Sequence, residues 1–353
     1  MIDAMKHGLV RRACLAGVMT IVAASCGATQ GDLQIGRLGD FRLESGAVIR
    51  ECQVGYRTYG KLNAQRSNAI LFPSWFTGTA EELASLIGPA KLVDSSQYFV
   101  IAVDALGDGV SSSPSNSPAQ PRMKFPEFSI CDMVAAEHEL VTKVLALPHL
   151  RAVIGISMGG MQTFQWMVSY PDFMDRAIPI VGSPRLGSYD LLLWQAELHA
   201  IEADANWKHG EYQARPAAAM RTVADIHALA LQTPQLRDRE TSPAKFPQFL
   251  GSVERSTMEG FDTNNWYRQA QAMMGHDVSR PFGGDMQKAA GMVHARVLVV
   301  ASLQDHMVTP WPALDFAKML KARTLELNSD CGHVATGCEE ARIAAAIAGF
   351  LQE

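Results

Sequence analysis

A serine set between two glycines, where an apolar run meets a helical pattern, constrains the fold of this chain most. The run from Ala152 rises into Gly155-Ile156-Ser157-Met158-Gly159, and a helix-like pattern follows at once. This is the local signature of a nucleophile elbow, in which a serine occupies a sharp turn between a strand and a helix. Because glycine has no Cβ, neighbouring backbone segments can approach these two positions closely without a clash. The pattern predicts a Ser157 hydroxyl that is lifted clear of the sheet, although an ordinary tight turn in an α/β domain would carry the same short motif.

Composition narrows the class of protein. The chain has 353 residues, 48% of them hydrophobic and 19% charged, which suits one large domain with an insertion or two domains. The net charge is −5 and no run of Lys and Arg stands out, so nucleic acid is not an expected partner. The spacing of Cys and His indicates no metal site, and no cofactor is expected.

Residues 1–28 have the pattern of an export signal. Basic residues including Arg11 and Arg12 precede an apolar run over residues 13–24, which is too short to span a bilayer. We therefore expect a bacterial protein that is periplasmic or lipid-anchored. Cys26 would be the anchor if the segment is a lipoprotein signal, and cleavage near Ala28 is the simpler alternative. The remaining alternative is a cytosolic protein with an amphipathic N-terminus.

Strand-like and helix-like patterns alternate along most of the chain. Strands are predicted over residues 53–59, 69–76, 97–104, 153–156, 177–181, 295–301 and 324–327, and helices over 129–147, 158–170, 312–320 and a last segment ending at 350. Such alternation predicts an α/β fold with a mostly parallel central sheet and helices on both faces.

A segment without strand signal interrupts this alternation. Residues 185–291 are rich in Ala, Gln, Met, Trp and His and have several helical stretches. The segment is too long to be a passive connection. We interpret it as a helical lid between the two parts of the core, residues 29–184 and 292–353. The alternative is a peripheral helical subdomain that does not touch the substrate.

A nucleophilic serine needs a base, and the base needs an acid that orients it. In a fold of this kind the chain order is serine, acid, histidine, each after the carboxyl end of a strand. Asp305 and His333 satisfy that order, because each follows a predicted strand. Thr336 and Glu339 could form a capping box that starts the last helix.

Other candidates for these roles fit less well. Asp330 is close to His333 in sequence, but a flanking loop carboxylate is usually solvated. His306 is adjacent to Asp305 and cannot easily pair with it, and His138 falls between two glutamates on a predicted solvated helix face. A non-catalytic binding protein on the same scaffold would lack the serine, the acid or the histidine, and none of the three is missing.

An oxyanion hole requires two backbone N–H donors. Met158, directly after the serine, supplies one in this arrangement, and the loop after an early strand supplies the other. Phe76, in the loop over residues 71–79, is our candidate. That aromatic loop could also simply pack under the lid, which would leave its N–H free for the same role.

Cys331 and Cys338 bracket His333 in sequence. In an oxidising compartment they could form a disulfide that closes a short loop. Cys338 could instead be a small buried helix residue.

With these residues in view, the chain resembles the homoserine O-acetyltransferase family of the α/β-hydrolase superfamily. The similarity runs over residues 55–351, and the stretches that carry it are 56–63, 125–134, 152–162, 201–212 and 261–264. The resemblance implies an α/β-hydrolase fold, a triad of Ser157, Asp305 and His333, an acyl-enzyme and ping-pong kinetics.

Three departures from the family weaken its literal activity. Val334 stands where the family has an acid that could hold the amino group of homoserine. Gly260 stands where an arginine that could clamp its carboxylate is usual, and residues 73–76 form a bulkier loop than the family's. Without both charged groups, a zwitterionic acceptor would be poorly held in a dry site.

We therefore predict a serine-dependent hydrolase of small carboxylic esters, whose partner is a small-molecule ester or acyl donor. The alternative is an O-acyltransferase that uses acyl-CoA as co-substrate and a hydroxyl acceptor. A homodimer is left open, and membrane contact is expected only through Cys26.

Overall fold

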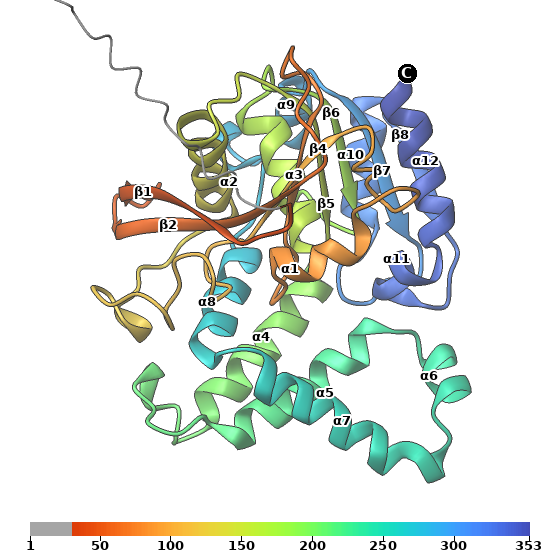
Figure 1. Cartoon of the computed structure of the whole chain (residues 1–353). Helices are drawn as coiled ribbons and strands as arrows, with labels where there is room; N and C mark the ends of the chain where they lie inside the picture. The colour runs from red at the N-terminus through yellow and green to blue at the C-terminus, as the bar shows by residue number, and fades with distance from the viewer. Residues whose placement is uncertain (1–29) are drawn as a thin grey trace, which may run out of the picture.

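The computed structural model of the protein describes residues 30–353, so the predicted export signal over 1–28 and the candidate anchor Cys26 lie outside the described residues (Figure 1). In the described part the chain forms one eight-stranded sheet. Its strands are β1 (Gln34–Arg42), β2 (Val48–Tyr59), β3 (Ala69–Pro73), β4 (Phe99–Val103), β5 (Leu150–Ile156), β6 (Met174–Ile180), β7 (Arg296–Ser302) and β8 (Arg323–Leu327).

The strand order is β1-β2-β4-β3-β5-β6-β7-β8. The pairs β1–β2 and β2–β4 are antiparallel, and every later pair is parallel. The predicted mostly parallel α/β fold is confirmed. Sequence patterns missed β1, whose residues are mostly exposed or half-buried and mix charged side chains with glycines. The strand predicted over 69–76 ends at Pro73, where the loop toward the site begins.

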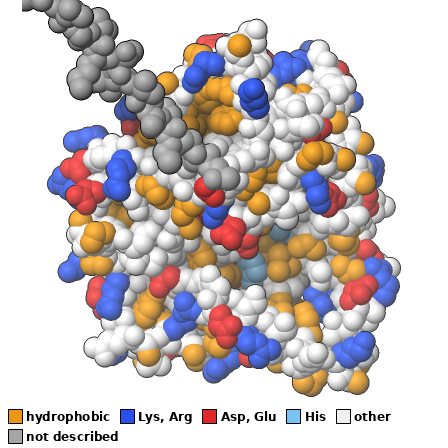
Figure 2. Space-filling view, viewed as in Figure 1, with side chains coloured by type: hydrophobic (Ala, Val, Ile, Leu, Met, Phe, Trp, Pro, Cys, Tyr) orange, Lys and Arg blue, Asp and Glu red, His pale blue; other side chains and the backbone are white. Residues whose placement is uncertain are grey.

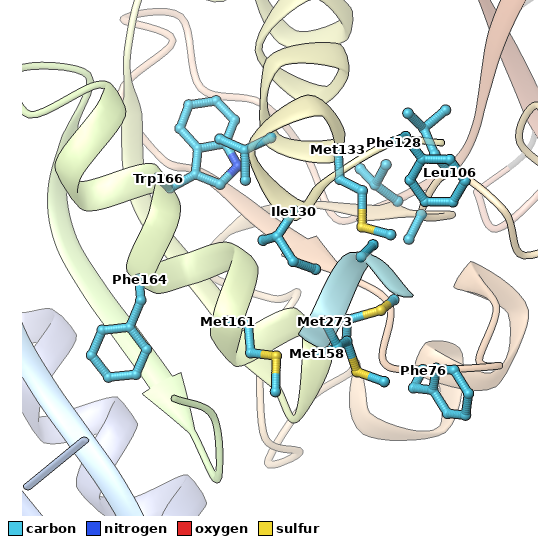
Figure 3. Close-up of a cluster of buried hydrophobic side chains, with 14 of the residues drawn as sticks. Phe76, Leu106, Phe128, Ile130, Met133, Met158, Met161, Phe164, Trp166 and Met273 are labelled. Atoms are coloured by element: carbon cyan, nitrogen blue, oxygen red, sulfur yellow. The ribbon is translucent and has the colours of Figure 1, made fainter. Parts of the chain in front are cut away.

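Alternation of side chains along the strands builds two hydrophobic layers, one on each face of the sheet. In β3, Leu71 belongs to one layer, whereas Ile70 and Phe72 belong to the other. The first layer packs against α2 (Ile130–Glu139), α3 (Met158–Ser169) and α10 (Trp311–Leu320), and part of it is shown in Figure 3. The second packs against α1 (Ala80–Leu83) and α12 (Glu340–Gln352). The two layers fix the strand ends that carry the site.

The segment between β6 and β7 folds as helices alone. They are α4 (Ser188–Ala203), α5 (Ala217–Leu231), α6 (Pro234–Glu240), α7 (Phe246–Gly260), α8 (Thr263–Met274) and α9 (Met286–Gly291). Figure 1 shows α4 to α7 gathered below the sheet, beyond α1 and α11 (Ala335–Cys338). Within residues 30–353, no helix has the length and apolar character needed to cross a membrane.

The helix predicted over 129–147 begins at the Ser129 capping box and continues after α2 as a π-helical turn, Leu140–Val144. The prediction that His138 lies on a solvated face is wrong. Its ring stacks on Tyr170 with centroids 3.9 Å apart, and burial lowers the pKa of this histidine. Aromatic neighbours more than 30 residues away were invisible to a local pattern.

Glu137, on the buried face of α2, is a titratable group inside the core. Its Oε2 accepts a hydrogen bond of 2.6 Å from the Trp166 indole N–H. Burial raises the pKa of this carboxyl from 4.5 to about 8. Because the folded-state pKa lies above the unfolded one, folding takes up a proton in this range. Stability is therefore full below pH 4.5 and is lost as the pH rises toward 8.

Replacing Glu137 by glutamine is expected to remove this pH dependence. The amide keeps an acceptor for Trp166 and cannot ionise, so the variant should exceed the wild type at pH 8 by on the order of 4 kcal/mol, and near pH 5 by less than about 1 kcal/mol. Urea unfolding at both pH values measures the difference. Glu139→Gln, at a less buried position, is the control. A difference between Glu137→Gln and wild type that does not change with pH would contradict the expectation.

Candidate active site

Ser157 sits at the sharp turn between β5 and α3. Its backbone has φ 57° and ψ −119°, a conformation that L-residues rarely adopt. Close packing imposes it: a Cβ on Gly155 would lie 2.0 Å from the Gly159 carbonyl oxygen, and one on Gly159 would lie 2.6 Å from that of Pro73. The Ser157 N–H donates to the Ile180 carbonyl at 2.9 Å. Glycine at both positions is therefore a steric requirement of the turn.

The structure brings the three predicted side chains together from three strand ends. Ser157 follows β5, Asp305 follows β7 and His333 follows β8. His333 Nε2 lies 2.8 Å from Ser157 Oγ, and His333 Nδ1 lies 2.7 Å from Asp305 Oδ2. All three residues are buried. This is a continuous hydrogen-bonded chain from a carboxylate through an imidazole to a hydroxyl.

The Asp305 carboxylate is held by its own loop. Its Oδ1 accepts hydrogen bonds from the N–H groups of Met307 at 2.8 Å and Val308 at 3.0 Å. Oδ2 is thereby left to face His333. Asp190 of α4, which sequence reasoning missed, anchors the far end of the loop by accepting from the Thr309 N–H at 3.1 Å and hydroxyl at 3.0 Å. The helical segment thus supports the position of the acid.

The His333 loop is fixed from two sides. The Thr233 hydroxyl, between α5 and α6, donates to the Asp330 carbonyl at 2.5 Å, and the Asp330 carboxylate pairs with Arg239. The predicted capping box is wrong: α11 begins after Val334 with no side-chain cap, and Glu339 itself precedes α12. Thr336 lies inside α11, which follows the short 3₁₀ turn Gly332–Val334, so it does not cap the start of a helix.

A disulfide joins Cys331 and Cys338 across this turn. Replacing both cysteines by serine is expected to lower the free energy of unfolding by about 2–3 kcal/mol, the chain-entropy value for so short a loop. Urea unfolding without reductant measures the loss. Dithiothreitol should destabilise the wild type by a similar amount and leave the double variant unaffected. Equal stability of the two oxidised proteins would contradict the expectation.

The two predicted oxyanion donors come from different elements. Met158 is the first residue of α3, and Phe76 lies in the loop after β3. Among residues 30–353, neither amide donates a hydrogen bond to a protein group. The Phe76 ring also packs under the helical segment, with its centroid 4.9 Å from Trp194 and 4.8 Å from Trp266. The two structural interpretations of this loop are therefore compatible.

A cavity of about 440 Å³, here called the inner cavity, opens onto Ser157 and His333. Its wall carries no Asp, Glu, Lys or Arg; it is formed by Trp75, Phe76, Thr77, Ser85, Leu86, Leu92, Ile156, Ser157, His227, Leu231, Met307, His333, Val334, Thr336 and Gly337. Figure 2 shows a hollow with histidine atoms inside it and hydrophobic side chains around it. The Ser157 hydroxyl therefore faces a mostly apolar space without charged side chains.

A second cavity of about 510 Å³, the outer cavity, lies against α5, α7 and α8. It shares Thr77, His227, Leu231 and Val334 with the inner cavity, so the two adjoin. Gly260 lies on the outer wall, and a Cβ there would meet nothing within 4 Å. The two single-residue departures from the acetyltransferase pattern, Gly260 and Val334, thus line the cavities of the site.

In the part of the chain that the structure describes, no three His, Cys, Asp or Glu side chains are grouped so that they could hold a metal ion.

Comparison with known proteins agrees with this geometry. Residues 69–336 match the α/β hydrolase fold family. The chain is 33% identical over 315 residues to an ethyl acetate hydrolase of Pseudomonas veronii, covering 86% of this chain and 90% of that protein. It is 31% identical over 354 residues to a homoserine O-acetyltransferase of Caulobacter vibrioides, covering 88% and 91%. The crystal structure of an acetylester hydrolase from Corynebacterium glutamicum superposes with a TM-score of 0.85 at 27% identity, covering 91% and 96%.

The fold, the elbow and these similarities define an α/β hydrolase. The protein belongs to that family, in the group that holds both ester hydrolases and homoserine O-acetyltransferases, and it is an enzyme of the hydrolase/acyltransferase type.

Proposed function

We propose that the protein hydrolyses small, uncharged carboxylic esters through an acyl-enzyme on Ser157. The observation that carries the choice of substrate is the inner cavity, which has no Asp, Glu, Lys or Arg on its wall. Homoserine bears an ammonium and a carboxylate, and burying either without a counter-charge costs several kcal/mol. A short neutral ester has no such requirement. The similarity to an ethyl acetate hydrolase and an acetylester hydrolase supports the same choice.

Each member of the hydrogen-bonded chain has a role in this reaction. Ser157 Oγ attacks the ester carbonyl while His333 Nε2 takes its proton, and His333 then gives that proton to the departing alcohol. Asp305 orients His333 and stabilises its cation. The N–H groups of Met158 and Phe76 hold the negative charge on the carbonyl oxygen. Water, activated by His333, then cleaves the acyl-enzyme to release the carboxylic acid.

The experiment that tests this function is an ester panel assayed with and without acetyl-CoA and homoserine. We expect the enzyme to hydrolyse ethyl acetate and similar esters. We expect no faster turnover of the ester or of acetyl-CoA when homoserine is added as an acyl acceptor. The acyltransferase alternative uses the same three side chains, so only the acceptor distinguishes it. Efficient acetyl transfer from acetyl-CoA to homoserine would overturn the proposal.

We further propose that the enzyme is exported, with residues 1–28 as its signal and residues 185–291 as a lid over the site. The disulfide supports export, because disulfides persist in oxidising compartments. The presence of α5 residues on both cavity walls supports the lid. Mass spectrometry of the N-terminus of the cellular protein tests export: a mature chain beginning near Cys26 or Ala28 is expected, and an intact Met1 would refute it.

A further inference from the structure

A second carboxylate–imidazole pair lies in the helical segment, apart from the triad. Glu197 of α4 is fully buried. Its Oε1 lies 3.0 Å from Nδ1 of His227, on α5, and its Oε2 accepts from the Trp266 indole N–H, on α8, at 3.0 Å. Both carboxylate oxygens are therefore engaged, and the pair ties three helices together. Residues so far apart in sequence gave no signal that could have joined them.

Aromatic side chains hold the His227 ring in place. Its centroid lies 5.1 Å from that of Trp266, 5.8 Å from that of Trp194 and 6.0 Å from that of Phe76. Phe76 supplies one of the two backbone donors proposed for the oxyanion. The imidazole is thus oriented by a hydrogen bond on one edge and by packing around it, and it directly adjoins the loop that faces Ser157.

The other nitrogen of this ring is free for a ligand. His227 lines both the inner and the outer cavity. Within residues 30–353, no protein group hydrogen-bonds its Nε2. A carboxylate only accepts hydrogen bonds, so the proton of the neutral imidazole resides on Nδ1, toward Glu197, and Nε2 is an acceptor. The structure therefore offers one fixed acceptor at the junction of the two cavities.

We propose that His227 is a specificity-determining residue, which accepts a hydrogen bond from a free hydroxyl group on the ester substrate. This inference rests on the proposed ester hydrolysis and names its substrate class, small esters such as the monoesters of short diols. A hydroxyl matches a neutral acceptor that faces the inner cavity, whose wall carries no Asp, Glu, Lys or Arg. An ammonium would also donate, but the inner cavity has no acidic side chain to balance its charge.

The test compares two acetates of the same size and shape, 2-hydroxyethyl acetate and propyl acetate. The wild type should prefer the first in kcat/KM. His227→Asn keeps an amide N–H near the position of Nδ1, facing Glu197, and removes Nε2. This variant should lose about tenfold in kcat/KM for 2-hydroxyethyl acetate, the size of one hydrogen bond, and change little for propyl acetate.

His227→Gln is the matched variant, because its longer side chain places a polar atom near the former Nε2. It should retain much of the preference, and thermal unfolding of both variants checks that the helical segment stays folded. An unchanged ratio of the two esters in His227→Asn would overturn the inference. A wild type that hydrolyses both acetates equally would overturn it while leaving the proposed function intact. A wild type that hydrolyses neither would contradict the proposed function and this inference with it.

Discussion

Replacing Ser157 by alanine is expected to lower kcat for hydrolysis of a short ester by about 10⁴- to 10⁶-fold. The Oγ that lies 2.8 Å from His333 Nε2 is the atom that would form the acyl bond, and alanine removes it alone. The turn itself should survive, because Gly155 and Gly159 create the space for it and both remain. A pH-stat assay with ethyl acetate measures the loss, and circular dichroism checks the fold.

Ser169→Ala is the matched control for this substitution. Ser169 ends the same helix, α3, on an exposed surface, where its hydroxyl accepts a hydrogen bond from Gln165 at 2.7 Å. That variant should keep wild-type kcat within about twofold, because exposed substitutions away from the site have small effects. Activity of Ser157→Ala within about tenfold of wild type would mean that another residue is the nucleophile.

Replacing Asp305 by asparagine is expected to lower kcat by about 10⁴-fold. The reason is visible in the loop. Because Oδ1 accepts from the N–H groups of Met307 and Val308, the amide oxygen of asparagine must take that place. Its NH₂ group then faces His333 Nδ1, which must accept. The imidazole proton moves to Nε2, and His333 can no longer take the proton of Ser157.

Asp330→Asn separates this effect from a general loss of negative charge near His333. The Asp330 carboxylate is partly exposed and pairs with Arg239, and removing one partner of such a pair changes little. We expect kcat within about twofold of wild type. The comparison uses initial rates of ester hydrolysis for both variants at one pH. The unfolding midpoint of each variant is measured to check that it is folded. Loss of activity in Asp330→Asn but not in Asp305→Asn would mean that Asp330, and not Asp305, is the acid that orients His333.

The site was predictable where its chemistry is local or ordered along the chain. The elbow is a short motif with steric requirements, and the order of Ser157, Asp305 and His333 follows from the ends of consecutive parallel strands. Features that depend on packing between distant segments could not be predicted. These include the Asp190 anchor of the acid loop, the Glu197–His227 pair and the stacking of His138. The capping box was predicted incorrectly because the helix α11 already begins at Ala335, one residue before Thr336.

The two departures from the acetyltransferase pattern that remove a charge acquire a physical meaning in the structure. Val334 and Gly260 could have been remote from the site, but both line its cavities. An acid and an arginine at these positions would place opposite charges along the path of a zwitterionic acceptor. Here neither position is charged, and the inner cavity that Val334 lines has no Asp, Glu, Lys or Arg, although Glu82 and Arg237 lie on the wall of the outer cavity. The loss of both charges supports the proposal that the protein acts on neutral esters.

The central claim is that Ser157 is the nucleophile, and labelling with a fluorophosphonate probe tests it most directly. Such probes phosphonylate an activated serine, so peptide mass spectrometry should find one probe per chain, on the peptide that carries Ser157. The Ser157→Ala variant should remain unlabelled, and Ser169→Ala should label like the wild type. No label on the folded wild type, or a label on a different residue, would contradict the claim.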